Sequence, residues 1–212
     1  MELKLRQDDS RCWYFAFGAN MHSETFIKSR RMSPLSKEVA RLPGFELVFD
    51  QKGVPLVEPA FASIRKSEGN EVWGVLYELS QKDFARLHYT EGENYQVRSI
   101  EVQGKATGAM QCFTYIGRRS KHGLNPSRRY LHKLISGAVE HGLPDGYINQ
   151  LKLFKSTYLP VASEVAGLVL KIVLWYSSKG RVVNLVVAKS GASHYVAEED
   201  EREKGKGVKP IL

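Results

Sequence analysis

Two short segments of the sequence carry residue types that could do chemistry. The first is Tyr14–Met21 (YFAFGANM), in which an apolar run enters a turn at Gly18. A strand that passes through a glycine turn into a helix exposes several backbone N–H groups in one direction. Such groups can hold a carboxylate or the oxygen of a polarised carbonyl. A plain connection between a strand and a helix has the same composition, so this segment alone leaves both interpretations open.

The second segment is Glu91-Gly92, at the junction between an expected helix and an expected strand. A carboxylate at such a junction can lie half-buried beside a cleft, where burial makes it a stronger base. A solvated loop acid is the competing interpretation, and the neighbouring Glu93 competes for any role. Tyr130, on the first turn of another expected helix, could offer its hydroxyl to a ligand, although such a tyrosine more often serves only in packing.

Several familiar kinds of site are missing from the sequence. No two of the histidines have the spacing of a metal site; they are His22, His88, His122, His132, His141 and His194. There is no phosphate-binding loop, no dinucleotide-binding glycine motif and no G-x-S-x-G motif, and no histidine is a convincing partner for a nucleophilic cysteine. The basic run 118–121 has no nucleic-acid-binding motif beside it, so we expect no nucleic-acid partner.

The charge of the chain favours anionic partners. Lys and Arg number 31 and Asp and Glu 23, which gives a formal net charge of +8. The excess is mostly dispersed, with small clusters at Lys28–Arg31, Arg118–Lys121 and Arg128–Arg129. We therefore expect an ordinary solvated surface, whose field would also attract a small anionic substrate.

Length and composition predict a globular cytoplasmic protein. The 212 residues fit one domain, or one domain with an appendage. We expect Cys12 and Cys112 to be buried thiols in a reduced compartment. The first nine residues lack the apolar core of a signal peptide, and the most apolar stretch, Val165–Tyr176, is interrupted by Lys171 and too short to span a bilayer.

The order of expected elements mixes strands with helices that are grouped late. The predicted strands are Cys12–Ala16, Glu46–Asp50, Phe61–Ile64, Glu71–Leu79, Tyr95–Val102 and Met110–Ile116. The first predicted helix is short and capped by Ser23, with Phe26 and Ile27 facing inward. The second starts at Ser80–Asp83 and stops before Gly92. The third runs from Asn125, Pro126 or Ser127 to Gly142, and the fourth from Pro144 through Phe154.

This pattern predicts an α+β fold, a small mixed, mostly antiparallel β-barrel or sheet with flanking helices. The composition changes after about Ser156. Leu168–Tyr176 and Val182–Ala188 are typical of a β-hairpin, and Glu198–Lys209 is nearly all charge and glycine. We therefore expect a domain over residues 10–155 and an extension over 156–212 that ends in a disordered tail.

Taken together, these segments resemble the γ-glutamylcyclotransferase family. Five matches lie in the correct order over roughly residues 12–155: Tyr14–Met21 (YFAFGANM), Gly69–Leu76 (GNEVWGVL), Leu87–Gly92 (LHYTEG), Ser127–Tyr130 and Gly137–Tyr147 (GAVEHGLPDGY). Any one of them is weak, whereas the ordered set is specific.

The resemblance implies a carbon–nitrogen lyase in which a γ-glutamyl amide loses its amine while the glutamyl part cyclises to 5-oxoproline. By resemblance, Glu91 is the acid–base residue and Tyr130 contacts the substrate. Backbone groups of the turn would hold the γ-glutamyl part; the residues concerned are Tyr14, Phe15, Ala16, Phe17, Gly18, Ala19 and Asn20. The substrate's own amine is the nucleophile, so the reaction needs no metal or cofactor.

The sequence also departs from the family pattern. Phe17 and Ala19 stand where Tyr and Ser are usual, so two hydroxyls are absent, and residues 156–212 have no counterpart. Glutathione is a less expected substrate, because the turn lacks the YGSL form of glutathione-specific relatives. The leaving group stays open between an amino acid, an amine and a protected biosynthetic intermediate. A non-catalytic binding module of the same fold is the alternative from another class, and a homodimer is left open.

Overall fold

The computed structural model describes residues 11–55, 57–91, 94–118 and 121–158. The strands are β1 (Arg11–Ala16), β2 (Ser36–Val54), β3 (Glu58–Ser80), β4 (Tyr95–Gly104) and β5 (Gly108–Gly117). The helices are η1 (Ala19–Met21, 3₁₀), η2 (Glu24–Ser29, π), α1 (Gln81–Glu91), α2 (Arg128–Glu140) and α3 (Asp145–Leu153).

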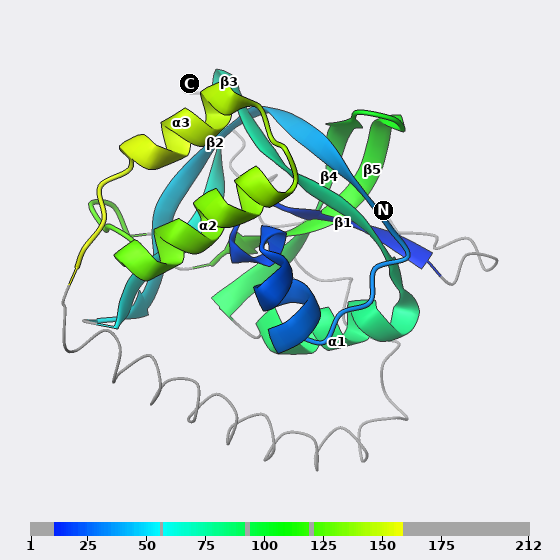
Figure 1. Ribbon diagram of the computed structural model, residues 1–212, viewed down its shortest axis with the longest axis horizontal. Coiled ribbons are helices and arrows are strands. Elements are labelled where there is room, and N and C mark those ends of the chain that lie inside the picture. Colours follow the sequence, from blue (N-terminus) through cyan, green and yellow to red (C-terminus); the bar gives the residue numbers. More distant parts are fainter. Residues whose placement is uncertain (1–10, 56, 92–93, 119–120, 159–212) are drawn as a thin grey trace, which may run out of the picture. The chain divides into compact units, whose positions relative to one another are not determined.

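The strands form a closed barrel in the order β1-β3-β2-β4-β5 (Figure 1). Strand β3 pairs antiparallel with both β1 and β2, and β4 pairs antiparallel with β2 and β5. The barrel closes where β1 meets β5 in parallel, at Tyr14 and Phe113. This arrangement confirms the predicted mixed, mostly antiparallel barrel with flanking helices.

The two strands predicted at 61–64 and 71–79 are a single long strand, β3. Its partner β2 is equally long, and their register runs from Ser36 opposite Glu78 to Val54 opposite Glu58. The polar stretch 67–70 falls at a register shift between Pro43 and Phe45, so the strand continues across it. A bulge absorbs such residues without ending the ladder, which the polar sequence alone did not reveal.

Strands β1 and β3 bury apolar side chains, and a glycine lets the two strands lie close together. Phe15, Leu76 and Leu79 are fully buried. A Cβ atom at Gly74 would lie 2.3 Å from the carbonyl oxygen of Ala16, so only glycine permits this approach of β1 to β3. The segment that leads into the turn at Gly18 is thus fixed against the longest strand.

The boundaries of the later helices agree with the sequence signals. Ser80 Oγ accepts a hydrogen bond from the backbone N–H of Asp83 (3.2 Å), and α1 ends at Glu91. Ser127 Oγ caps α2 by accepting from the N–H of Tyr130 (3.0 Å), and Gly142 has the positive φ of a helix C′ residue (66°).

The short helix after the turn differs from its prediction. It is a π-helix, and the Ser23 side chain does not cap it but donates to Glu140. Phe26 is fully buried as expected, whereas Ile27 is 41 % exposed. Adjacent residues of a helix point in different directions, so the expectation that Phe26 and Ile27 both face inward was wrong for Ile27.

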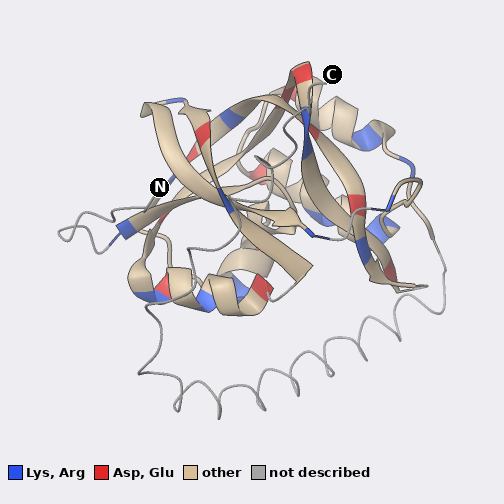
Figure 2. Cartoon of the chain, turned by 180° about the vertical axis from the view of Figure 1, so that it is seen from behind, with Lys and Arg blue, Asp and Glu red and all other residues tan. Residues whose placement is uncertain are grey.

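Both cysteines are free, Cys112 buried and Cys12 only half-buried. The expected hairpin at 168–188 and the charged tail lie outside the described residues. Figure 2 shows both signs of charge spread over the strands and helices. Within the described ranges, no helix combines the length and apolar character needed to cross a membrane.

Candidate active site

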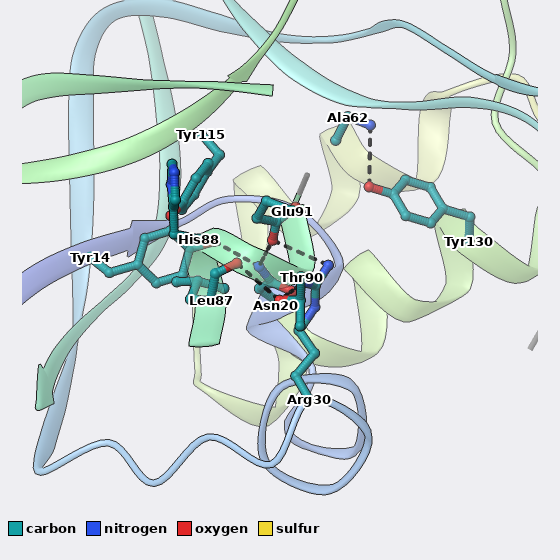
Figure 3. A network of polar contacts seen from close by, with 10 residues as sticks. All are labelled: Tyr14, Asn20, Arg30, Ala62, Leu87, His88, Thr90, Glu91, Tyr115 and Tyr130. Carbon is teal, nitrogen blue, oxygen red and sulfur yellow. Dashed lines mark hydrogen bonds and ion pairs between the residues drawn. The ribbon is translucent and has the colours of Figure 1, made fainter. Parts of the chain in front are cut away.

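Glu91 occupies the C-terminal end of α1 and turns its carboxylate toward the glycine turn. Its side chain is only 8 % exposed. The Oε1 atom accepts a hydrogen bond from Asn20 Nδ2 (2.8 Å) and forms an ion pair with Arg30 Nη2 (3.1 Å), as Figure 3 shows. The solvated loop acid that the sequence left open therefore does not describe Glu91.

Asn20 links this carboxylate to the first strand. The same Nδ2 atom donates to the hydroxyl of Tyr14 (2.8 Å), so one amide connects Tyr14 and Glu91. Asn20 is 7 % exposed and lies in η1. Both groups that it contacts come from different elements, β1 and α1, and the turn holds them together.

The turn contains the short 3₁₀ helix η1, and α2 packs against it. The N–H groups of Met21 and His22 donate to the carbonyls of Gly18 (3.0 Å) and Ala19 (3.1 Å). The N–H groups of Ala19 and Asn20 precede these bonds and make no hydrogen bond inside the helix. A Cβ atom at Gly137 would lie 2.7 Å from the His22 nitrogen, so α2 approaches the turn at a position that only glycine allows.

Tyr130 reaches the other side of the turn from α2. Its hydroxyl accepts a hydrogen bond from the backbone N–H of Ala62 in β3 (3.2 Å). A Cβ atom at Gly18 would be 3.4 Å from this hydroxyl, so the turn and Tyr130 are in contact. Figure 3 shows Tyr130 and Ala62 beside the Glu91 cluster rather than within it. Burial raises the pKa of Tyr130 well above its usual value, and the hydroxyl stays protonated.

The negative charge of Glu91 contributes to raised pKa values at three further tyrosine hydroxyls. Burial first, and then this carboxylate, raise the pKa values of Tyr14 and Tyr115. The pKa of Tyr95 is raised by burial, by Tyr130 and by Glu91. All three remain neutral at physiological pH and can act as hydrogen-bond donors in the site.

The structure brings some of the predicted residues together through side chains and others only through the backbone. Tyr14, Asn20 and Glu91 form one hydrogen-bonded chain. The side chains of Phe15, Ala16 and Phe17 are buried in the core, so these residues can meet a ligand only through backbone groups. That placement agrees with the expected use of backbone contacts and does not test it.

Sequence reasoning missed four residues around Glu91, namely Arg30, Thr90, Tyr95 and Tyr115. Arg30 belongs to the basic cluster 28–31, which we interpreted as solvated surface, yet its guanidinium contacts both Glu91 and Thr90 (Nη1 to Oγ1, 2.6 Å). The two tyrosines lie on β4 and β5, and only the closure of the barrel brings them near α1. No signal in the sequence marks that closure.

The chemistry available is that of one carboxylate among an amide, tyrosine hydroxyls and one arginine. Within the described ranges, no group of three or more His, Cys, Asp or Glu side chains could hold a metal ion. A buried carboxylate that faces backbone N–H groups can move a proton while those groups bind a developing negative charge.

Comparison with known proteins points to one group of enzymes. A family model described as the AIG2-like family matches residues 71–151. The γ-glutamylcyclotransferase of Mus musculus is 32 % identical over 152 residues, which are 69 % of this chain and 80 % of that relative. A γ-glutamyl cyclotransferase of Aspergillus oryzae is 25 % identical over 192 residues, 79 % of this chain and 70 % of the relative. A solved structure of a γ-glutamyl cyclotransferase superposes with a TM-score of 0.63 at 27 % identity and covers 76 % of this chain and 99 % of that chain.

Proposed function

Because the chain belongs to the γ-glutamylcyclotransferase family, we propose that it cyclises the γ-glutamyl part of a small γ-glutamyl amide to 5-oxoproline and releases the amine. In this proposal Glu91 is the acid–base residue, and no side chain forms a covalent bond to the substrate. The observation that carries the proposal is the 2.8 Å hydrogen bond between Glu91 and Asn20, because it holds the carboxylate against the turn.

The reaction needs one proton carrier. Glu91 takes a proton from the α-ammonium group of the substrate, and the freed nitrogen bonds to the γ-carbonyl carbon. Glu91 passes this proton to the leaving nitrogen, and the bond from the carbon to that nitrogen breaks. The attacking nitrogen gives up a second proton by the same route, so the product is a neutral lactam and the amine departs as an ammonium ion. A carboxylate in this role typically contributes about 10²–10⁴-fold in rate.

The turn supplies the second part of catalysis. As the tetrahedral intermediate forms, negative charge develops on the former carbonyl oxygen. The N–H group of Ala19 is directed at the Tyr130 hydroxyl, whereas that of Asn20 makes no hydrogen bond within η1 and is suited to bind the substrate oxygen. Loss of one such donor in comparable sites costs about 10²–10³-fold in rate. This contact uses the backbone, so it tolerates Ala19 in place of serine.

A direct assay tests the proposal. Purified protein is incubated with γ-glutamyl-alanine and, separately, with ε-(γ-glutamyl)-lysine, and 5-oxoproline is measured. We expect the wild type to form 5-oxoproline from at least one substrate and Glu91→Gln, which keeps the shape but removes the base, to form almost none. The control is Glu46→Gln, because Glu46 is a partly exposed acid that pairs with Arg65 on the barrel wall.

The outcomes separate the candidate functions. Turnover of γ-glutamyl-alanine alone supports a γ-glutamyl amino acid substrate, and turnover of ε-(γ-glutamyl)-lysine alone supports a γ-glutamyl amine. Binding of a γ-glutamyl compound without 5-oxoproline formation would leave the non-catalytic binding module as the function. Full activity in Glu91→Gln would remove Glu91 from the mechanism.

A further inference from the structure

We propose that Arg30 is a positioning residue for the cyclisation, because it holds one oxygen of Glu91 and leaves the other to exchange protons with the substrate. This inference rests on the proposed function. It assigns a role to a residue of the basic cluster 28–31 and distinguishes the two oxygens of the carboxylate.

The contacts of the Glu91 carboxylate are unequal. Oε1 accepts from Asn20 Nδ2 (2.8 Å) and pairs with Arg30 Nη2 (3.1 Å). Among the residues that the structure describes, none donates a hydrogen bond to Oε2. Two contacts on one oxygen fix the plane of the carboxylate and direct its other oxygen. We therefore assign the proton transfer to Oε2.

Arg30 is itself held in place. Its Nη1 donates to Thr90 Oγ1 (2.6 Å), and Thr90 Oγ1 donates to the carbonyl of Leu87 (3.0 Å). The guanidinium thus contacts two successive residues at the end of α1, and Figure 3 shows it approaching them from the η2 side. One nitrogen of the arginine fork makes a hydrogen bond and the other an ion pair, which positions the charge in a way that a single ammonium group does not.

The backbone around Arg30 is irregular on both sides. Arg30 follows a π-helix, Glu24–Ser29, and such helices occur often at functional sites. Arg31 has a positive φ of 57°, the only described residue other than glycine with this conformation, and its carbonyl accepts a hydrogen bond from Arg86. Such backbone conformations persist where the surrounding structure enforces them, and here they place the Arg30 side chain on Glu91.

The position of Glu91 explains why it requires a cation. It is the last residue of α1, where the helix dipole is negative and disfavours a carboxylate. Its side chain is 8 % exposed and that of Arg30 is 24 % exposed. An exposed pair such as Arg65–Glu46, at 49 % and 35 %, is screened by water and contributes little. The pair between Arg30 and Glu91 is shielded from water, so its attraction is screened less.

The experiment compares Arg30→Ala and Arg30→Lys with the matched surface variant Arg65→Ala. The measurements are kcat and KM for 5-oxoproline formation from the substrate that the wild type turns over, together with the thermal unfolding midpoint. We expect Arg30→Ala to lower kcat by about 10²-fold, since a small misplacement of a reacting group has that effect, and to leave KM nearly unchanged. Arg30→Lys keeps the charge without the fork, so its kcat should lie between that of Arg30→Ala and that of the wild type. Arg65→Ala should behave like the wild type.

Added methylguanidinium provides a readout that a purely structural role would not give. It should fill the space left in Arg30→Ala and restore part of kcat, and it should do nothing for Glu91→Gln. An unchanged kcat in folded Arg30→Ala would overturn the inference, and so would a rise in KM alone, which would make Arg30 a substrate contact. If Arg30→Ala does not fold, the kcat of Arg30→Lys decides in the same way. Absence of 5-oxoproline from the wild type would instead refute the proposed function.

Discussion

Asn20 donates from Nδ2 to Oε1 of Glu91 over 2.8 Å, although 71 positions separate the two residues. The bond joins the turn after β1 to the end of α1. Replacing Asn20 with Ala removes it and also the bond to Tyr14, so we expect kcat for 5-oxoproline formation to fall by about 10–10²-fold. Asn20→Asp should be worse, because it places a second carboxylate against Glu91 and like charges repel.

Comparing Asn20→Ala with Asn20→Asp separates a loss of Glu91 orientation from a loss of stability. Asp keeps the size of the side chain and Ala does not, so a stability defect alone would make Ala the weaker variant. Steady-state kinetics and thermal unfolding of both proteins provide the measurement. Equal activity of Asn20→Asp and wild type would show that Asn20 does not orient Glu91.

The hydroxyl of Tyr130 is the hydrogen-bond partner of a backbone N–H group in β3. It accepts from the N–H of Ala62, next to the register shift in the β2–β3 pairing between Val48 and Gln51. In Tyr130→Phe this buried N–H loses its partner, which costs about 1–3 kcal/mol. We expect a lower free energy of unfolding in urea and, if Tyr130 contacts the substrate, a raised KM. Tyr115→Phe serves as the comparison, since it removes a hydroxyl whose contact is His88 Nδ1 (3.4 Å).

A buried carboxyl group anchors the helix that carries Tyr130. Glu58 is 3 % exposed and accepts from the N–H (2.9 Å) and the Oγ (2.7 Å) of Ser127, the cap of α2. Burial raises the pKa of Glu58 above its usual value of 4.5, although the hydrogen bonds from Ser127 and the charge of Arg129 oppose the shift. Folding therefore favours the protonated carboxyl.

This raised pKa gives the pH dependence a definite sign. The contribution of Glu58 to stability is complete below the unfolded pKa and is lost as the pH rises through the raised folded pKa. Glu58→Gln cannot ionise and lacks this loss. Urea unfolding of both proteins at several values between about pH 4 and pH 7 should show the stability of the wild type decreasing, relative to the variant, as the pH rises. A difference that does not change with pH would contradict the shift.

Local signals in the sequence predicted most elements of the fold. Ser80 and Ser127 mark helix starts and Gly142 a helix end, because capping depends on residues close in the chain. Runs rich in Val, Ile and aromatic residues marked the strands. The continuity of β3 was missed, since a strand can pass through a polar bulge when a long partner pairs with it on both sides.

The site was predictable only in part, for a related reason. Tyr14, Asn20 and Glu91 were identified by resemblance, and the structure joins them by hydrogen bonds. Arg30 was not, since in the sequence it belongs to an ordinary basic cluster and only the π-helix directs it inward. The closure of a barrel and the direction of a side chain are consequences of long-range packing, which a single sequence does not display.

Replacement of glycine by alanine should change the stability of the protein in opposite directions at two helical positions. Gly137 lies in α2, where a Cβ atom would be 2.7 Å from the His22 nitrogen and 2.8 Å from the Met21 carbonyl carbon. Gly146 lies in α3, where a Cβ atom would meet nothing within 4 Å. Alanine favours a helix over glycine by about 1 kcal/mol, so Gly146→Ala should raise the unfolding midpoint. Gly137→Ala should lower the free energy of unfolding by about 1–3 kcal/mol, as overpacking against the backbone does, and reduce activity by displacing the turn. Thermal unfolding and 5-oxoproline assays of both variants check this, and a Gly137→Ala protein as stable and active as the wild type would show that α2 does not set the position of the turn.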